Sequence, residues 1–436
     1  MDVVTLSRLQ FAITVGFHFI FVSINMGMAW LLVVIEALGW RRKDGDVYVQ
    51  IAKFYSKLFG LTFVVGVATG IVMEFQFGTN WAGYSRFTGN VFGVLLSAEV
   101  LAAFFLESVF LGLYLFGRGR VSKGVHWLSI LLTAVGMTLS AFWILAANSW
   151  QQTPAGHIVR NGTAEMVSFM DVVFNPSTIF RFLHTVDATV ITGTFFMAGV
   201  AAYLLLQDSE NEHAKKTMRL ALTLGLIFSF LQVVPFGHEH AIQVAHTQPE
   251  KFAAFEGIYR TRSHAPLVLF GIPTADPPEL KGEIGIPGLL SLITFGDVDA
   301  TIKGINEFPA DEIPPLILPF IAFRTMVFLG LYFILIMAIG TTQLYRGRLW
   351  SNRVILRILK WSLPLPILAS ELGWIAAEVG RQPWAVYRVL KTEDAVSAAL
   401  SSGEVLFSLI LFGIVYIFIG IFYIYVMRGS ISSLKQ

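Results

Sequence analysis

A small set of polar side chains interrupts long apolar segments of this sequence, and their chemistry suits iron binding and proton transfer. The ionisable members are His18, Glu36, Glu74, Glu99, Glu107, His126, His184, Asp187, Arg324, Glu371 and Glu378. An ionisable group near the middle of a membrane span costs about 2.5–3.5 kcal/mol on insertion scales, so each is a candidate for function. Glu36 and Glu74 lie at the ends of their segments, where reaching the membrane interface is the favoured explanation.

Four side chains in these segments are suited to bind heme iron. His18, His184, Met326 and Glu378 supply imidazole, thioether and carboxylate groups. A His/Met pair makes a six-coordinate electron-transfer heme, whereas a single protein ligand leaves the iron open for oxygen. Taken singly, a buried histidine is more often a hydrogen-bonded packing residue, and a buried methionine more often fills space. Their depth in the membrane therefore decides how they are interpreted.

Composition identifies a polytopic membrane protein. Of the 436 residues, 55% are hydrophobic and only 14% are charged, and the mean hydropathy is +0.67. Soluble domains do not show this usage. The net charge of +2, carried in short clusters, gives no indication of a nucleic-acid partner. The absence of cysteine excludes disulfides, iron–sulfur clusters, thiolate-ligated heme and covalently attached heme, so a metal must be held by His, Met, Asp, Glu or Tyr.

Runs of about 20 apolar residues predict an all-α fold with nine transmembrane helices. The predicted ranges are 9–38, 52–76, 91–116, 123–149, 178–206, 216–236, 316–345, 354–379 and 404–427. The first run is too long for the core of a signal peptide, so we expect this helix to be retained. Helices one to six then occupy residues 1–236 and helices seven to nine occupy 316–436. The segment 237–315 between them is too long and too rich in Pro and Gly for a passive link, and we expect it to bind a ligand.

Basic residues orient these helices. One set of loops contains Arg41, Arg42, Lys43, Lys53, Lys57, Arg118, Arg120, Lys123, Lys215, Lys216, Arg219, Arg346, Arg348, Arg353, Arg357, Lys360, Arg428 and Lys435. Apart from 237–315, the alternate set contains only Arg8, Arg86, Arg160, Arg181, Arg381, Arg388 and Lys391. The positive-inside rule makes the first set cytoplasmic. It predicts an N-terminus outside, a C-terminus in the cytoplasm and an outer location for 237–315.

This orientation brings the four candidate iron ligands to one level of the membrane. The helices that begin at 9, 178 and 316 run inward, which places His18, His184 and Met326 in their outer halves. The helix 354–379 runs outward, so Glu378 lies at its outer end. All four therefore lie next to the long outer segment.

The stretch "GWIAAEVGRQPW", residues 373–384, adds a geometric constraint. Glu371 and Glu378 are two helical turns apart on nearly the same face, with Trp374 between them. A stripe of carboxylate, indole and carboxylate would face the bundle interior. In the alternative interpretation, Glu378 forms an ion pair with Arg381 at i+3 and Pro383 ends the helix. The residues alone leave both interpretations open.

Glu99 and Glu107, in "AEVLAAFFLES", are separated by about 12 Å of helix rise. Buried acids of this kind exchange protons, so a proton relay is one interpretation. Hydrogen bonding between helices is the other, and the pattern favours neither.

Several long stretches resemble one family. "GWIAAEVGRQPW" is similar to the GRQPW signature of the large subunit of cytochrome bd quinol oxidases, and further similar stretches are "MEFQFGTNWAGYSRFTGNVFG", "AEVLAAFFLESVFLGLYLFG", "LSAFWILAANSWQQTPAG", "RFLHTVDA", "QPEKFAAFEG" and "FRTMVFLG". The resemblance implies a terminal oxidase of the prokaryotic cytoplasmic (inner) membrane that oxidises quinol and reduces dioxygen to water. It also implies a heterodimer with a smaller subunit II and allows small single-helix accessory subunits.

The resemblance assigns heme ligands residue by residue. "FLHT" and "FRTM" imply that His184 and Met326 are the axial pair of a low-spin heme b. Arg324, 200° around the helix from Met326, would neutralise heme propionates. His18 and Glu378 would each hold a high-spin heme, one of b type and the other usually of d type, or a third heme b.

Other positions take roles from the same resemblance. Trp374 would lie between the high-spin hemes, and Arg381 would orient Glu378 or a propionate. Lys251 and Glu256, in "QPEKFAAFEG", match quinol-binding positions.

A further group matches the polar residues that lead protons from the cytoplasm to the oxygen site: Glu99, Glu107, Ser140 and Asn148. Because quinol protons leave outside and the protons for water come from inside, the enzyme would generate a proton motive force without pumping.

Three features depart from the family pattern. The segment 237–315 resembles the short version of the family's quinol loop. "GHEHAIQVAH" contains His238, His240 and His246, for which a solvated loop is favoured over a metal site. Asp187 is an acid where an uncharged residue is expected, and no role is assigned to it.

Two alternatives accompany this assignment. A cyanide-insensitive oxidase with only b-type hemes is compatible with the same ligands. A proton-coupled transporter would also use intramembrane acids, but the sequence shows no inverted repeat. A heme-copper oxidase is disfavoured because the membrane histidines are too few for a copper centre in addition to hemes.

Overall fold

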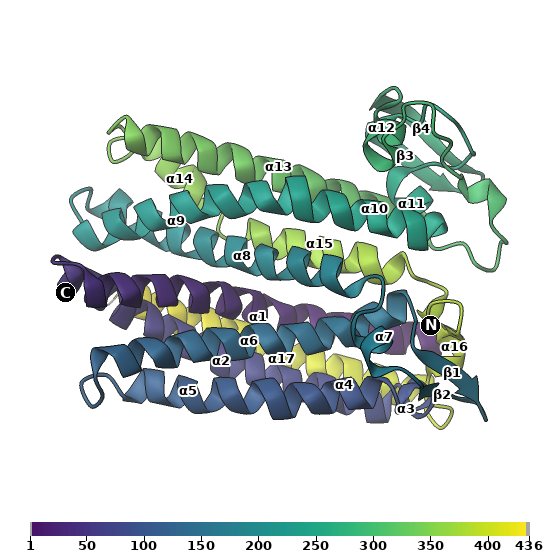
Figure 1. Cartoon of the computed structure of the whole chain (residues 1–436), viewed down its shortest axis with the longest axis horizontal. Helices are drawn as coiled ribbons and strands as arrows, with labels where there is room; N and C mark the ends of the chain where they lie inside the picture. Colours follow the sequence, from purple (N-terminus) through teal and green to yellow (C-terminus); the bar gives the residue numbers. More distant parts are fainter. Residues whose placement is uncertain (1, 433–436) are drawn as a thin grey trace.

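The computed structural model describes residues 2–432 and shows a bundle of long helices that run side by side along one axis (Figure 1). Eight helical stretches are long and apolar enough to cross a membrane. They are α1 (Val3–Arg41), α2 (Gly45–Thr79), α4–η1–α5 (Phe92–Phe116), α6 (Lys123–Gln152), α8 (Thr178–Gln207), α9–η2–α10 (Glu212–Thr247), α13 (Ile317–Tyr345) and α17 (Ser402–Ser432). The predicted all-helical membrane architecture is confirmed at this level.

The helix predicted at 354–379 is broken. It consists of α14 (Arg353–Trp361) and α15 (Leu365–Val379), with a turn at 362–364 between them. Pro364 and Pro366 explain the break, because proline lacks the N–H that continues a helix and suits the first turn of a new one. At 1.5 Å per residue α15 spans about 22 Å, less than the apolar thickness of a bilayer. The described residues thus contain eight continuous candidate spans rather than nine.

Two of the spans contain a π-helical turn that the apolar pattern did not predict. One is η1 (Val100–Phe104), between α4 (Phe92–Glu99) and α5 (Phe105–Phe116). The other is η2 (Gln232–Gly237), between α9 (Glu212–Leu231) and α10 (His238–Thr247). Pro235 lies inside η2, where its missing N–H removes a normal helical hydrogen bond. π-turns of this kind occur often at functional sites.

The continuation into α10 changes one predicted boundary. The helix expected to end at 236 extends to Thr247, so the connecting segment begins at Gln248. "GHEHAIQVAH" is therefore mostly helix and not a solvated loop.

The short elements gather at one end of the bundle (Figure 1). They are α3 (Ala82–Thr88), β1 (His157–Arg160), β2 (Thr163–Met166), α7 (Phe169–Val173), α11 (Pro249–Glu256), β3 (Leu267–Ala275), β4 (Pro278–Ile286), α12 (Leu289–Phe295), η3 (Ile305–Glu307), β5 (Trp384–Val386), β6 (Leu390–Lys391) and α16 (Thr392–Ala395). The strands form three separate antiparallel hairpins. The first described residues lie at this end and the last at the opposite end (Figure 1). Lys435, used above to orient the chain, lies outside the described residues.

Helix α8 lies at the centre of the bundle and α17 at its edge. In their most apolar stretches 89% of α8 but only 11% of α17 is buried. α8 crosses α1 closely at two glycines: a Cβ on Gly193 would lie 2.5 Å from the carbonyl carbon of Gly27. Small residues allow this approach between membrane helices, which otherwise gain little from apolar burial against one another.

We predict that Gly193→Ala destabilises the protein by about 1–3 kcal/mol or more, because the added methyl meets backbone that cannot move aside. Thermal unfolding of the purified protein measures the effect. Gly413→Ala in α17 is the matched control, since nothing lies within 4 Å of the added Cβ. Equal melting temperatures for the two variants would contradict the close crossing of α1 and α8.

Candidate functional site

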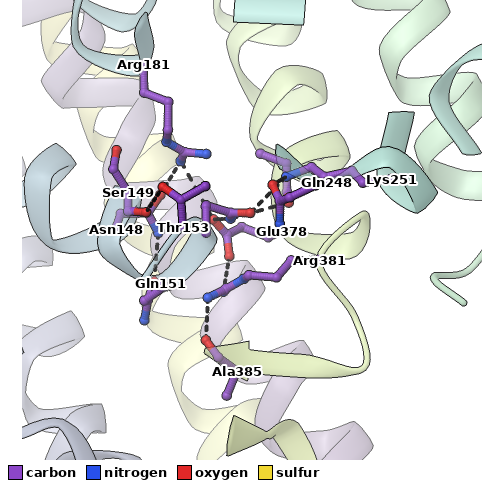
Figure 2. Close-up of polar contacts among 12 residues, drawn as sticks. Asn148, Ser149, Gln151, Thr153, Arg181, Gln248, Lys251, Glu378, Arg381 and Ala385 are labelled. Carbon is purple, nitrogen blue, oxygen red and sulfur yellow. Dashed lines mark hydrogen bonds and ion pairs between the residues drawn. The ribbon is translucent and has the colours of Figure 1, made fainter. Parts of the chain in front are cut away.

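Glu378 lies in a polar cluster at the C-terminal end of α15 (Figure 2). One carboxylate oxygen accepts a hydrogen bond from Arg381. The other accepts from Asn148 Nδ2 at 3.1 Å and from Gln152 Nε2 at 3.2 Å. Arg381 also donates to the carbonyl of Ala385, which fixes the chain after the helix. The ion pair at i+3, one of the two interpretations left open by the sequence, is therefore present.

Two further basic side chains belong to this cluster. Arg181, near the start of α8, donates to Asn148 and lies 4.0 Å from the Glu378 carboxylate. Lys251, on α11, donates to the side-chain oxygen of Gln152 at 2.8 Å. Asn148 and Gln152 are one turn apart on α6, so one helix face presents both amides.

The cluster has an excess of positive charge. Arg181, Lys251 and Arg381 are all buried and surround the single carboxylate of Glu378. Burial, reinforced by Arg181, holds the pKa of Lys251 well below its ordinary value and favours the neutral amine. The Nε atoms of both arginines are buried and donate no hydrogen bond within the described chain. This arrangement suits a further anionic group, such as a carboxylate of a bound cofactor.

Gly380 explains how α11 reaches the cluster. A Cβ at this position would lie 2.9 Å from the ring of Phe255 and 3.0 Å from Cγ of Lys251. Glycine therefore allows α11 to pack directly against the turn that follows α15.

Helix α11 makes a second buried contact through Glu256. Its carboxylate forms an ion pair with Arg324 of α13, and both side chains are at least nine-tenths buried. The Arg324 guanidinium also lies over the Phe320 ring, 5.5 Å from its centroid. Burial raises the pKa of Glu256, while Arg324 opposes that shift. The two residues predicted to bind quinol thus lie on one short helix and contact different parts of the bundle.

His184 borders the π-turn η2, whereas Met326 packs against α15. His184 Nε2 lies 3.2 Å from Gln232 Nε2, and its ring centroid is 5.3 Å from that of His240. Its Nδ1 is buried without a partner among the described residues. Met326 of α13 faces Gly373 of α15, where an added Cβ would lie 2.8 Å from the sulfur.

His18 lies elsewhere, between α1 and α2. Its Nδ1 is 3.0 Å from the hydroxyl of Thr69, and its ring faces Gly70, where a Cβ would lie 3.1 Å from Cε1. Glu371 of α15 packs against α1 at Gly16, half a turn from His18.

These surroundings fit heme better than a bare metal ion. Within residues 2–432 no group of three or more His, Cys, Asp or Glu side chains is placed to hold a metal. A porphyrin brings its own four nitrogens and needs only one or two protein ligands. His18 and Met326 each pack directly on a glycine, Gly70 and Gly373, where an added Cβ would lie 3.1 Å from the imidazole and 2.8 Å from the sulfur. Unpaired nitrogens on Arg181, Arg324 and Arg381 are available to acidic groups.

The residues predicted to lead protons are arranged along α6. Ser140 donates to Glu99 at 2.6 Å, and Asn148, about 12 Å further along α6, binds Glu378. Glu107 of α5 is buried, and its backbone packs against Gly136 of α6. The π-turn η1 lies between Glu99 and Glu107 and sets their relative orientation.

Sequence reasoning did not assign several residues of the site. Arg181 was placed among outer-loop cations, although its partner Asn148 is in the motif "ANSWQQ" together with Gln152. Gln232, next to His184, had no sequence signal beyond the proline that distorts its helix, and His240 was noted only as one of three clustered histidines.

Other residues that the sequence analysis singled out lie outside these clusters. His246 is exposed and meets the Phe295 ring edge to face, with 5.5 Å between centroids. Among residues 2–432 no three such side chains are placed to hold a metal, so His238, His240 and His246 form no common site. Trp374 is half-buried. Both carboxyl oxygens of Asp187 are buried without a hydrogen-bond partner in the described chain, and nothing in the structure explains the acid.

Comparison with known proteins agrees over the whole chain. The family model for cytochrome bd terminal oxidase subunit I matches residues 6–434. The chain is 39% identical to cytochrome bd ubiquinol oxidase subunit 1 of Bacillus subtilis, over 99% of this chain and 94% of that protein. It is 34% identical to cytochrome bd-II ubiquinol oxidase subunit 1 of Escherichia coli, over 98% of this chain and 96% of that protein.

A solved structure gives the same result. The bd oxidase from Geobacillus thermodenitrificans superimposes with a TM-score of 0.94 at 30% identity, covering 99% of both chains. The family implies heme cofactors, a quinol substrate and a role in respiratory electron transport. The family predicted from sequence motifs is thus confirmed, and this chain belongs to the cytochrome bd terminal oxidase subunit I family.

Proposed function

We propose that this chain is the heme-bearing subunit of a terminal oxidase that oxidises quinol at the outer face of a prokaryotic cytoplasmic membrane and reduces dioxygen to water. A smaller subunit II completes the enzyme. The observation that carries the proposal is the placement of α11, whose Lys251 joins the Glu378 cluster while Glu256 joins Arg324. A quinol bound at this helix would be next to both groups of candidate heme-binding residues.

Contacts at the two ends of the broken helix α14–α15 indicate how this part of the chain crosses the bundle. Arg353, which begins α14, donates to the carbonyl of Leu206 at the inner end of α8. Glu378, near the end of α15, contacts Gln152 at the outer end of α6. The chain therefore crosses the bundle between 353 and 379. This supports nine crossings, which put the two termini on opposite sides, and the distribution of basic residues supports an outer N-terminus and a cytoplasmic C-terminus.

The candidate ligands would hold three hemes. His184 and Met326 would bind a low-spin heme b, and His18 and Glu378 would bind a high-spin heme b and a heme d or third heme b. When bound, these groups accept electrons from quinol and bring dioxygen to iron. Arg324 and Arg381, with unpaired Nε atoms, would neutralise propionates, and Trp374 would occupy the space between the high-spin pair.

Lys251 and Glu256 would act on quinol directly. Oxidation of quinol releases two electrons and two protons. The low pKa of Lys251 leaves an amine able to accept a hydrogen bond or a proton from a quinol hydroxyl. The Glu256 carboxyl, held by Arg324, would orient the other hydroxyl. Protons would then leave on the outer side.

The acids of α4 and α5 that pack against α6 would supply protons from the cytoplasmic side. Reduction of one dioxygen to two waters consumes four electrons and four protons. Glu107, Glu99, Ser140 and Asn148 would pass these protons from the cytoplasm toward the oxygen site, and the Ser140–Glu99 bond of 2.6 Å supports one such transfer. Charge is separated because release and uptake occur on opposite faces, without a pump.

The quinol assignment predicts the behaviour of Glu256→Gln. Loss of the carboxylate should lower quinol-driven turnover about 10- to 100-fold, because a positioned acid–base group is removed. Oxygen reduction with a small soluble electron donor should stay unchanged. Glu239→Gln, at an exposed position on α10, serves as the control. Unchanged kcat and KM for quinol would contradict the assignment.

The axial assignment predicts the spectrum of Met326→Leu. Leucine nearly conserves volume but has no ligand atom. The low-spin heme b band in the reduced-minus-oxidised spectrum should be lost or shifted. Met337→Leu, at a buried methionine of the same helix, should leave the band in place. An unchanged low-spin spectrum in Met326→Leu would show that Met326 is not an axial ligand.

The proton assignment predicts that Glu99→Gln slows oxygen reduction by about 10-fold or more, since glutamine preserves the shape but cannot ionise. Its KM for quinol and its low-spin heme spectrum should match those of the parent. Ser97→Ala, which removes only a bond to the carbonyl of Gly93, should be silent. Parental turnover in Glu99→Gln would exclude this path.

A further inference from the structure

The β3–β4 hairpin has one apolar face that the described chain leaves uncovered. Phe270, Ile272, Ile284 and Ile286 are between 46% and 62% exposed. Phe270 is paired with Ile284 across the two strands, so these side chains lie on the same face. Contiguous apolar side chains in a segment outside the helices mark a surface that contacts lipid or protein.

The opposite face of the hairpin is fixed against the bundle. Val268 is fully buried, and Leu280 lies 3.1 Å from the Cβ position of Gly257, at the end of α11. β3 also contacts α13. The hairpin therefore cannot turn its apolar face inward without losing these contacts.

The hairpin is at the level of the membrane surface. Ile317, Leu318 and Ile321 are exposed in the first turns of α13. Exposed apolar residues of a membrane-spanning helix face lipid, so the leaflet reaches the beginning of α13. Figure 1 shows β3, β4 and α12 beyond this end of α13 and projecting to the side of the bundle. β3 contacts α13, so the hairpin lies next to the end of α13 that carries these exposed residues.

The charges of the hairpin surround this face. Asp276 and Glu279 lie at the turn, and Glu283 is paired with Arg262 at 3.1 Å. Lys281 is opposite Ile272, and its Nζ pairs with Glu279 at 3.0 Å near the turn. An apolar centre with a charged rim is typical of segments that lie in the interface of a bilayer.

We propose that the apolar face of the β3–β4 hairpin lies in the headgroup region of the outer leaflet, with the lipid surface itself as its partner. A consequence rests on the proposed function. Because Leu280 packs on Gly257, directly after Glu256, the hairpin borders the route by which a lipid-soluble quinol reaches α11.

The absence of cysteine makes a direct test simple. Phe270→Cys and Ile284→Cys are labelled singly with an environment-sensitive fluorophore in the complete oxidase, which is reconstituted in phosphatidylcholine nanodiscs. Leu331→Cys, at an exposed position in the middle of α13, is the lipid reference, and Lys303→Cys, exposed in the same extramembrane segment, is the aqueous reference. Quenching is measured with spin-labelled lipid and with iodide.

The proposal predicts that lipid spin-labelled at its headgroup quenches positions 270 and 284 more than positions 331 and 303, and that iodide quenches them less than position 303. Quenching by iodide alone would show a face in water, and protection from both quenchers would show a protein partner. Either result overturns the proposal. The readout is independent of turnover, so it separates this inference from the proposed quinol chemistry.

A kinetic measurement tests the consequence. The double variant Phe270→Ser with Ile284→Ser should raise the KM for a long-chain quinol and leave the KM for a short-chain, water-soluble quinol at the parental value. Equal changes for both quinols would overturn the role in quinol access.

Discussion

A charge buried in an apolar bundle is tolerated only where opposite charge and hydrogen bonds surround it, and the Glu378 cluster satisfies this requirement at the C-terminal end of α15. Arg381 and Arg181 supply opposite charge, and Asn148 and Gln152 supply hydrogen bonds. Because these partners come from α6, α8 and the turn after α15, the ion pairs hold the ends of three helices together. Lys251 attaches α11 to the same cluster through Gln152.

The cluster also relates structure to chemistry. With Lys251 neutral, its two arginines still exceed its one carboxylate, so it suits a further acidic group. Heme propionates carry negative charge of this kind. On the other side of α11, Arg324 is likewise paired with a buried carboxylate, that of Glu256. One short helix thus connects the region proposed for quinol with both regions proposed for heme. The acids Glu99 and Glu107 belong to a separate contact of α4, η1 and α5 with α6, which agrees with separate routes for outgoing and incoming protons.

Sequence patterns predicted the helical architecture because long apolar runs have few alternatives in a membrane. They placed α14 and α15 in one helix because prolines at 364 and 366 look tolerable in an apolar run. They ended α9 too early because His238 and Glu239 lowered the hydropathy of a segment that stays helical through η2. Spacing along the helix was enough to suggest the Glu378–Arg381 pair, and the family resemblance was enough to group Ser140 with Glu99. The roles of Arg181 and Gln152 depend on how α6 and α8 pack, which spacing along a single helix does not contain.

The central claim is that these helices carry heme for the oxidation of quinol. A reduced-minus-oxidised spectrum of the purified complex, with pyridine hemochrome analysis, tests it most directly. The account predicts Soret and b-type heme bands that appear on reduction by quinol, with a far-red band if one heme is of d type and none if all are of b type. A purified protein with no Soret absorption would contradict the account and favour a proton-coupled transporter.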